Sequence, residues 1–136
     1  MPYQNDQFAN AFRRLRIREE NNNNIYNNPL RPFSSREKAR LQQYIINVYD
    51  MQLQYDRHRN QVNMEERVER IQELSNEEYQ SEAQAIFKTY RDVLVLIRER
   101  HHQSMEELRC ATPARFMELL EEAQQLQRQL RERFQS

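Results

Sequence analysis

The chain has 136 residues, with 21 basic (Lys plus Arg) and 21 acidic side chains, so its formal net charge at pH 7 is zero. This length predicts a single domain of ordinary size. A neutral chain has no overall field to attract nucleic acid or an anionic membrane, so any such binding must come from a local patch. Glycine is absent, which disfavours the glycine-rich, phosphate-cradling loops of several enzyme classes.

The compartment is predicted from the cysteine content and the apolar runs. Cys110 is the single cysteine, which excludes an internal disulfide and favours a reducing compartment. The first residues have no apolar signal-peptide core. The longest apolar run, residues 93–97, is far short of the roughly 20 residues that cross a bilayer. We therefore expect a cytoplasmic or nuclear protein with no membrane partner. Cys110 is expected to be a half-buried residue at a helix end.

Residues 1–20 are predicted to form an amphipathic helical arm. Its apolar stripe consists of Phe8, Phe12 and Leu15. Its basic side consists of Arg13, Arg14, Arg16 and Arg18. A helix of about 15 residues is marginally stable alone, so we expect it to dock on the rest of the chain or on a partner. Its basic side suits phosphates of RNA or DNA, an acidic protein, or an acidic surface of this chain.

Residues 21–33 are predicted to be an extended linker. Asparagine is a poor helix former, and Pro29 and Pro32 fix φ and lack a backbone donor. Leu30 and Phe33 are the apolar side chains by which this linker would contact the helical part or a partner.

A helix is predicted to start at Ser34, because Glu37 follows at the spacing of a capping box. Apolar positions lie on two sides of it between residues 41 and 55, namely Leu41, Tyr44, Ile45, Val48, Met51 and Tyr55 on one side and Ile46, Tyr49 and Leu53 on the other. Such a helix needs neighbours on both sides. We expect a kink or break at residues 60–63, since Asn60 or Asn63 can end or recap a helix.

The next helix is predicted over residues 75–110, again with a capping-box pair, Ser75 and Glu78. Its main apolar face consists of Tyr79, Ala83, Ile86, Tyr90, Val93, Ile97 and Leu108, widened in the middle by Phe87, Leu94, Val95 and Leu96. We expect residues 41–55 and the following helix to cover this middle and form the thickest part of the core. Where the cover ends, Ile97, His101 and Met105 are candidate partner-binding residues.

Thr112 and Pro113 predict the start of the last helix, as a cap residue followed by proline at the first helical position. Its apolar side runs from Phe116 to Phe134. Short connections between long helices favour antiparallel neighbours. The predicted fold is therefore all-α, an elongated antiparallel bundle of three long helices over residues 34–136 with the appended N-terminal helix.

No arrangement of side chains predicts catalysis or a cofactor. His102, Glu106 and Cys110 lie four residues apart, but three ligands on one helix face are spread over about 12 Å and do not reach one metal ion together. Acidic residues occur as pairs on predicted outer faces, the ordinary pattern of solvated helices. We expect no enzyme activity, no metal, no cofactor and no small-molecule substrate.

Two segments resemble the Pat family of mRNA decapping activators, which is also described as topoisomerase II-associated. REKARLQQYIINVYDMQLQ, residues 36–54, is similar to the family's helical segment ending in an MQLQ-like run, and IFKTYRDVLVLI, residues 86–97, is similar to its later helix. The aspartate and tyrosine motif expected after MQLQ is replaced by YDRHRNQ, and the family's large C-terminal helical domain is missing. The resemblance implies a scaffold of RNA-decay factors with RNA affinity and no catalytic residue.

The sequence predicts a non-enzymatic helical adaptor or scaffold subunit that assembles with a protein partner or a second copy, with the resemblance implying an RNA-decay or other ribonucleoprotein complex. One alternative is a nucleic-acid-binding accessory protein that uses the four arginines of the N-terminal arm. A viral or other structural assembly protein is a further alternative, since helical patterning does not separate it from an adaptor.

Overall fold

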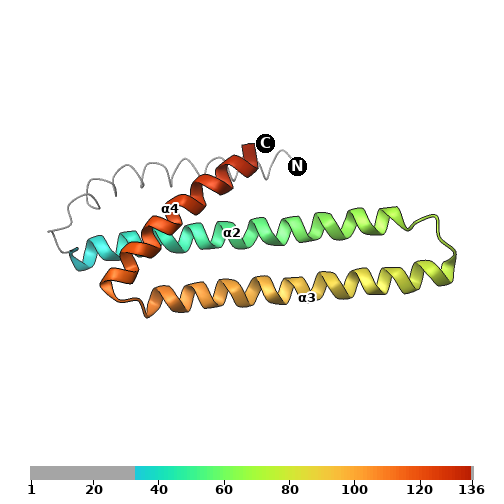
Figure 1. Cartoon of the computed structure of the whole chain (residues 1–136), viewed down its shortest axis with the longest axis horizontal. Helices are drawn as coiled ribbons and strands as arrows, with labels where there is room; N and C mark the ends of the chain where they lie inside the picture. Colours follow the sequence, from blue (N-terminus) through green and yellow to red (C-terminus); the bar gives the residue numbers. More distant parts are fainter. Residues whose placement is uncertain (1–32, 136) are drawn as a thin grey trace. The chain divides into compact units, whose positions relative to one another are not determined.

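The computed structural model describes residues 33–135, which form three α-helices and no strand: α2 (Ser35–Arg70), α3 (Asn76–Arg109) and α4 (Pro113–Gln135) (Figure 1). The predicted all-α class is confirmed. The N-terminal arm and nearly all of the predicted linker lie outside the described residues, so both remain predictions. Within residues 33–135, no helix combines the length and the apolar character that a bilayer crossing demands.

Side-chain caps begin the helices as the sequence predicts. Ser34 Oγ accepts a hydrogen bond from the Glu37 backbone N at 3.1 Å, and the Glu37 carboxylate accepts one from the Ser34 backbone N at 3.4 Å. This reciprocal pair is the capping box. Ser75 Oγ accepts from the Glu78 backbone N at 3.4 Å at the start of α3. These contacts satisfy backbone donors that a helix start leaves without intrahelical partners.

The start of α4 is also confirmed. Thr112 Oγ1 accepts a hydrogen bond from the Arg115 backbone N at 3.2 Å, and Pro113 is the first helical residue. Proline loses nothing at this position because its missing N–H would have no intrahelical partner.

The predicted break at residues 60–63 is wrong, since α2 is continuous from Ser35 to Arg70. Asn60 does not cap a helix end. Its side-chain Nδ2 donates to the Tyr90 main-chain oxygen of α3 at 3.0 Å. The amide is therefore used between helices, and this tertiary contact overrides the local preference of asparagine for caps and turns.

The chain divides into two compact units. The described part of unit 1 consists of residues 33–49 and 107–135, where the first half of α2 packs against α4. Its buried hydrophobic side chains are Leu41, Tyr44, Ile45 and Val48 from α2, Leu108 from the end of α3, and Phe116, Leu119, Leu120, Ala123 and Leu130 from α4. Within this core the Tyr44 hydroxyl donates to Gln127 Oε1 of α4, so the buried amide has a partner.

Unit 2, residues Asp50–Glu106, is a hairpin of the rest of α2 with nearly all of α3. His101 Nε2 lies 2.9 Å from Asp50 Oδ1, whereas Asn60 bonds to Tyr90, so the two helices run in opposite directions along their contact. The buried hydrophobic side chains that the structure describes in this unit are Met51, Ala83 and Ile97. Unit 2 thus has a thin seam of buried side chains where unit 1 has a core.

The prediction that other helices bury the whole middle of α3 is wrong. Phe87, Val95 and Leu96 are exposed, although residues 41–55 and α4 were predicted to cover them. The apolar side of α4 instead packs on the first half of α2 in unit 1. A helix of 23 residues has one apolar side, and once that side is buried against α2 it is not available to α3.

Candidate functional site

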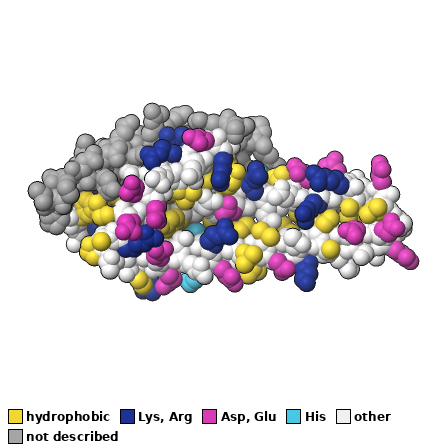
Figure 2. All heavy atoms as spheres, in the orientation of Figure 1, with side chains coloured by type: hydrophobic (Ala, Val, Ile, Leu, Met, Phe, Trp, Pro, Cys, Tyr) yellow, Lys and Arg dark blue, Asp and Glu magenta, His cyan; other side chains and the backbone are white. Residues whose placement is uncertain are grey.

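Three large apolar side chains of α3 are exposed in unit 2. Phe87 is 41%, Val95 47% and Leu96 57% exposed. Figure 2 shows apolar side chains reaching the surface between charged ones on this face of the molecule. Single exposed hydrophobic residues are normal in proteins. Three within ten positions of one helix, above a thin buried seam, instead mark this helix as suited to a partner.

Consecutive residues of an α-helix are turned by about 100°, and this rotation places Phe87 and Val95 on one side of α3. We call this side the α3 stripe. It comprises Glu77, Gln80, Gln84, Phe87, Lys88, Arg91, Val95 and Arg98, all of them exposed. Leu96 follows Val95 directly and points to a different side, opposite Phe87. Leu94, half-buried, borders the stripe on the side that faces α2.

The charges of the α3 stripe are ordered along the helix. Glu77 lies near the start of α3, and Lys88, Arg91 and Arg98 follow in the second half of the stripe, between residues 88 and 98. Within residues 33–135, none of these four side chains makes a salt bridge. The stripe is thus acidic at one end, apolar in parts of its middle and basic toward the other end, with its charges available to a partner.

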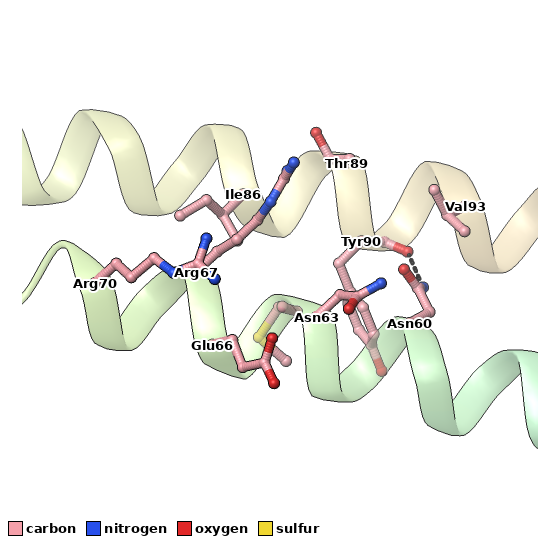
Figure 3. Close-up of a pocket in the computed structure, with 10 residues that line it drawn as sticks. Asn60, Asn63, Glu66, Arg67, Arg70, Ile86, Thr89, Tyr90 and Val93 are labelled. Atoms are coloured by element: carbon pink, nitrogen blue, oxygen red, sulfur yellow. Dashed lines mark hydrogen bonds between the residues drawn. The ribbon is translucent and has the colours of Figure 1, made fainter. Parts of the chain in front are cut away.

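A cavity of about 440 Å³ opens between α2 and α3 in unit 2 (Figure 3). Its lining consists of Asn60, Asn63, Met64, Glu66, Arg67, Arg70, Ile86, Thr89, Tyr90 and Val93. In the close-up, the side chain of Arg67 reaches across the space toward α3, and the Asn60 amide points to the Tyr90 main chain. The cavity therefore lies where polar side chains interrupt the packing of the two helices.

The chemistry of this cavity is limited. Two guanidinium groups attract an anion, but Arg67 and Arg70 are exposed and Glu66 lies beside them, so water and the neighbouring carboxylate compete with any ligand. No group of three or more His, Cys, Asp or Glu side chains able to hold a metal ion is present in the part of the chain that the structure describes. We regard the α3 stripe as the stronger candidate site.

The predicted partner residues of α3 have different surroundings. Ile97 is buried, with 9% of its surface exposed, so it belongs to the seam of unit 2. His101 is half-buried and contacts Asp50, which places its ring inside the hairpin contact. Met105 is half-buried, as is Phe33 at the start of the described chain.

The other predicted site residues lie outside the described residues and stay predictions. They are Phe8, Phe12, Arg13, Arg14, Leu15, Arg16, Arg18 and Leu30. Cys110, expected to be half-buried, is exposed just after the end of α3. Its thiol is therefore open to oxidants when the protein is handled without a reducing agent.

A charged cluster in unit 1 joins α3 to α4. Arg115 contacts Glu107 at 2.6 Å, Glu118 at 2.8 Å and Glu122 at 3.1 Å, and hydrogen bonds to these carboxylates raise its already high pKa. Partial burial, followed by the negative charges of Glu107 and Glu122, raises the pKa of Tyr49 to about 12. Each carboxylate of the cluster is paired with the same guanidinium. The cluster therefore stabilises the turn between the end of α3 and the start of α4.

The sequence contained the signal for the α3 stripe. Arg91 lies four residues after Phe87, and Arg98 lies three residues after Val95. Both spacings place the arginines on the helix side of these apolar residues, and charged neighbours on one face indicate exposure. Taken alone, Phe87, Leu94, Val95 and Leu96 predict a wider core, whereas the arginines beside them predict an exposed surface. Comparison with protein-family models, with curated proteins and with solved structures finds no match to this chain.

Proposed function

We propose that this protein is a non-enzymatic helical adaptor or assembly subunit that binds another protein chain through unit 2. The observation that carries the proposal is the exposure of Phe87, Val95 and Leu96 on a hairpin that buries little of its own apolar surface. Burying such side chains is worth roughly 25 cal/mol per Å² of apolar area, so covering them with a partner is favourable.

The geometry of unit 2 supports this function further. Two paired helices bury one seam, and in residues 50–106 the opposite sides of both carry exposed side chains. Among the described residues, many apolar side chains along the seam are half-buried, including Val62, Met64, Val68, Ile86 and Val93. A third or fourth helix from a partner would complete their burial, as helices do in a bundle.

The proposed adaptor is an elongated antiparallel bundle, and its proposed place of assembly is a ribonucleoprotein complex. An elongated antiparallel bundle with an appended N-terminal helix suits an adaptor, because its length presents a long surface to several partners. The resemblance of residues 36–54 and 86–97 to the Pat family supports a ribonucleoprotein complex in the cytoplasm or nucleus as the place of assembly.

The test compares the tagged full chain with a triple variant, Phe87→Gln, Val95→Gln and Leu96→Gln, by light scattering and by affinity purification. We expect the unmodified chain to associate with itself or with a partner protein, and the variant to lose that association while its circular dichroism stays helical. The control Gln103→Ala changes an exposed polar residue of α3 and should behave as the unmodified chain does. A monomeric unmodified chain that captures no protein would contradict the function.

A further inference from the structure

The α3 stripe has an order of charges that is complementary to itself. Read along the helix, it starts with Glu77, continues through Gln80 and Gln84 to Phe87, and ends with basic Arg98. A surface that is acidic at one end and basic at the other matches its own copy when the copy is reversed. Symmetric pairing of identical surfaces is the commonest way in which soluble chains form dimers.

We propose that the α3 stripe binds a second copy of this chain, with the two α3 helices antiparallel and the two-fold axis between Phe87 and Lys88. This inference rests on the proposed function, whose partner it specifies. The pairing places Glu77 of one copy opposite Arg98 of the second copy, because the two residues are equally far along the helix from the axis. The same symmetry makes this contact twice.

Apolar contacts lie near the axis of this pairing. The two copies of Phe87 meet there, and the aliphatic stem of Lys88 covers the aromatic ring of the second copy's Phe87, an arrangement that favours cation–π attraction. Arg91 lies opposite Gln84, which offers an amide oxygen to its guanidinium. The side chains that are exposed in one copy thus contact each other in two.

A parallel pairing of the same stripe is disfavoured by its charges. It would place Arg98 beside Arg98 and Glu77 beside Glu77, and like charges in contact destabilise a helix pair. The direction of the pairing therefore follows from the order of the charges, and the exposed apolar residues alone would not decide it.

The size of the α3 stripe predicts the strength of the dimer. From Glu77 to Arg98 it extends about 30 Å, and at a width of about 10 Å it is smaller than the roughly 800 Å² per partner of a standard interface. A weak dimer follows, with a Kd on the order of 10 µM. Its salt bridges are exposed at the edges, so the dimer should weaken as salt rises.

Sedimentation of the purified full chain between about 1 and 300 µM tests the proposal, with a reducing agent present because Cys110 is exposed. We expect a concentration-dependent dimer. Phe87→Gln should raise the Kd by about tenfold or more. Leu96→Gln removes an apolar side chain that is more exposed than Phe87 from a different side of α3, and it is the matched control, with an unchanged Kd expected.

Charge reversal tests the antiparallel register. Glu77→Arg alone and Arg98→Glu alone should each raise the Kd by about tenfold, because each creates repulsion at two symmetric contacts. The double variant Glu77→Arg/Arg98→Glu restores opposite charges and should return the Kd to within about threefold of the original. All these positions are exposed, and helical circular dichroism checks that each variant is folded.

Three outcomes would overturn the pairing: a chain that stays monomeric throughout, a dimer that Leu96→Gln weakens as much as Phe87→Gln, or a double variant as weak as the single ones. The proposed function survives the first of these if the chain binds a different protein and the triple variant described above loses it. Failure of the dimer and failure of the adaptor function are therefore distinguishable.

Discussion

At the scale of single residues, the contact between Tyr44 and Gln127 explains how unit 1 tolerates an amide in its core. Both side chains are fully buried, and a buried amide without a hydrogen bond costs free energy. The Tyr44 hydroxyl donates to Gln127 Oε1, so the first half of α2 and α4 are joined by a polar contact as well as by packing.

Tyr44→Phe is expected to lower the free energy of unfolding by about 0.5–1.5 kcal/mol, because the hydrogen bond from the Tyr44 hydroxyl to Gln127 Oε1 is lost. Urea unfolding followed by circular dichroism measures the effect. Tyr79→Phe is the matched control. Tyr79 is half-buried and its hydroxyl has no hydrogen-bond partner in residues 33–135, so a change below about 0.5 kcal/mol is expected. Equal losses in the two variants would show that the Tyr44 hydroxyl is not important.

At the scale of the helices, side-chain caps decide where each one begins, and the sequence predicts them well. Ser34, Ser75 and Thr112 each accept a backbone hydrogen bond at a helix start. These contacts are made within four residues of the chain, so no tertiary information is needed to predict them. The continuity of α2 at Asn60 was not predictable in this way, because the partner of its amide lies on α3.

Thr112→Ala is expected to lower the free energy of unfolding by about 1 kcal/mol, since the Arg115 backbone N loses its acceptor at the start of α4. The matched control is Thr89→Ala, in the interior of α3, where the Thr89 hydroxyl donates to the Ala85 main-chain oxygen. Alanine is the better helix former there, so this substitution should be neutral or stabilise by up to about 0.5 kcal/mol. Thermal unfolding of both variants would reveal the opposite signs, and a Thr112→Ala protein as stable as the original would exclude a capping role.

At the scale of the whole molecule, the two units differ in how much they bury. Unit 1 contains the fully buried side chains Leu41, Ile45, Leu120 and Leu130. Unit 2 has its buried hydrophobic residues spread along a hairpin, at Met51, Ala83 and Ile97. Local stability follows the density of buried apolar contacts, so the units should open with different free energies.

Hydrogen exchange of the monomer at low concentration is expected to show this difference. Backbone amides of residues 41–48 and 116–130 should exchange at least about 100-fold more slowly than those of residues 53–68 and 79–93. Raising the concentration should slow exchange in α3 of unit 2, where the second copy would bind, and leave unit 1 unchanged. Equal protection of both units at low concentration would contradict the thin seam as the weak part of the fold.

The sequence by itself determined the all-α class, the helix starts and the apolar side of α4, because caps and helical periodicity depend on residues close together in the chain. Tertiary structure alone decided which apolar residues are buried. Phe87 and Ile97 belong to the same apolar stretch of α3, yet one is exposed and the other is in the seam. Periodicity shows that a side chain is able to be buried, but burial needs an opposing surface. The apolar side of α4 is used by α2 in unit 1, and Phe87 and Val95 are exposed among the residues that the structure describes.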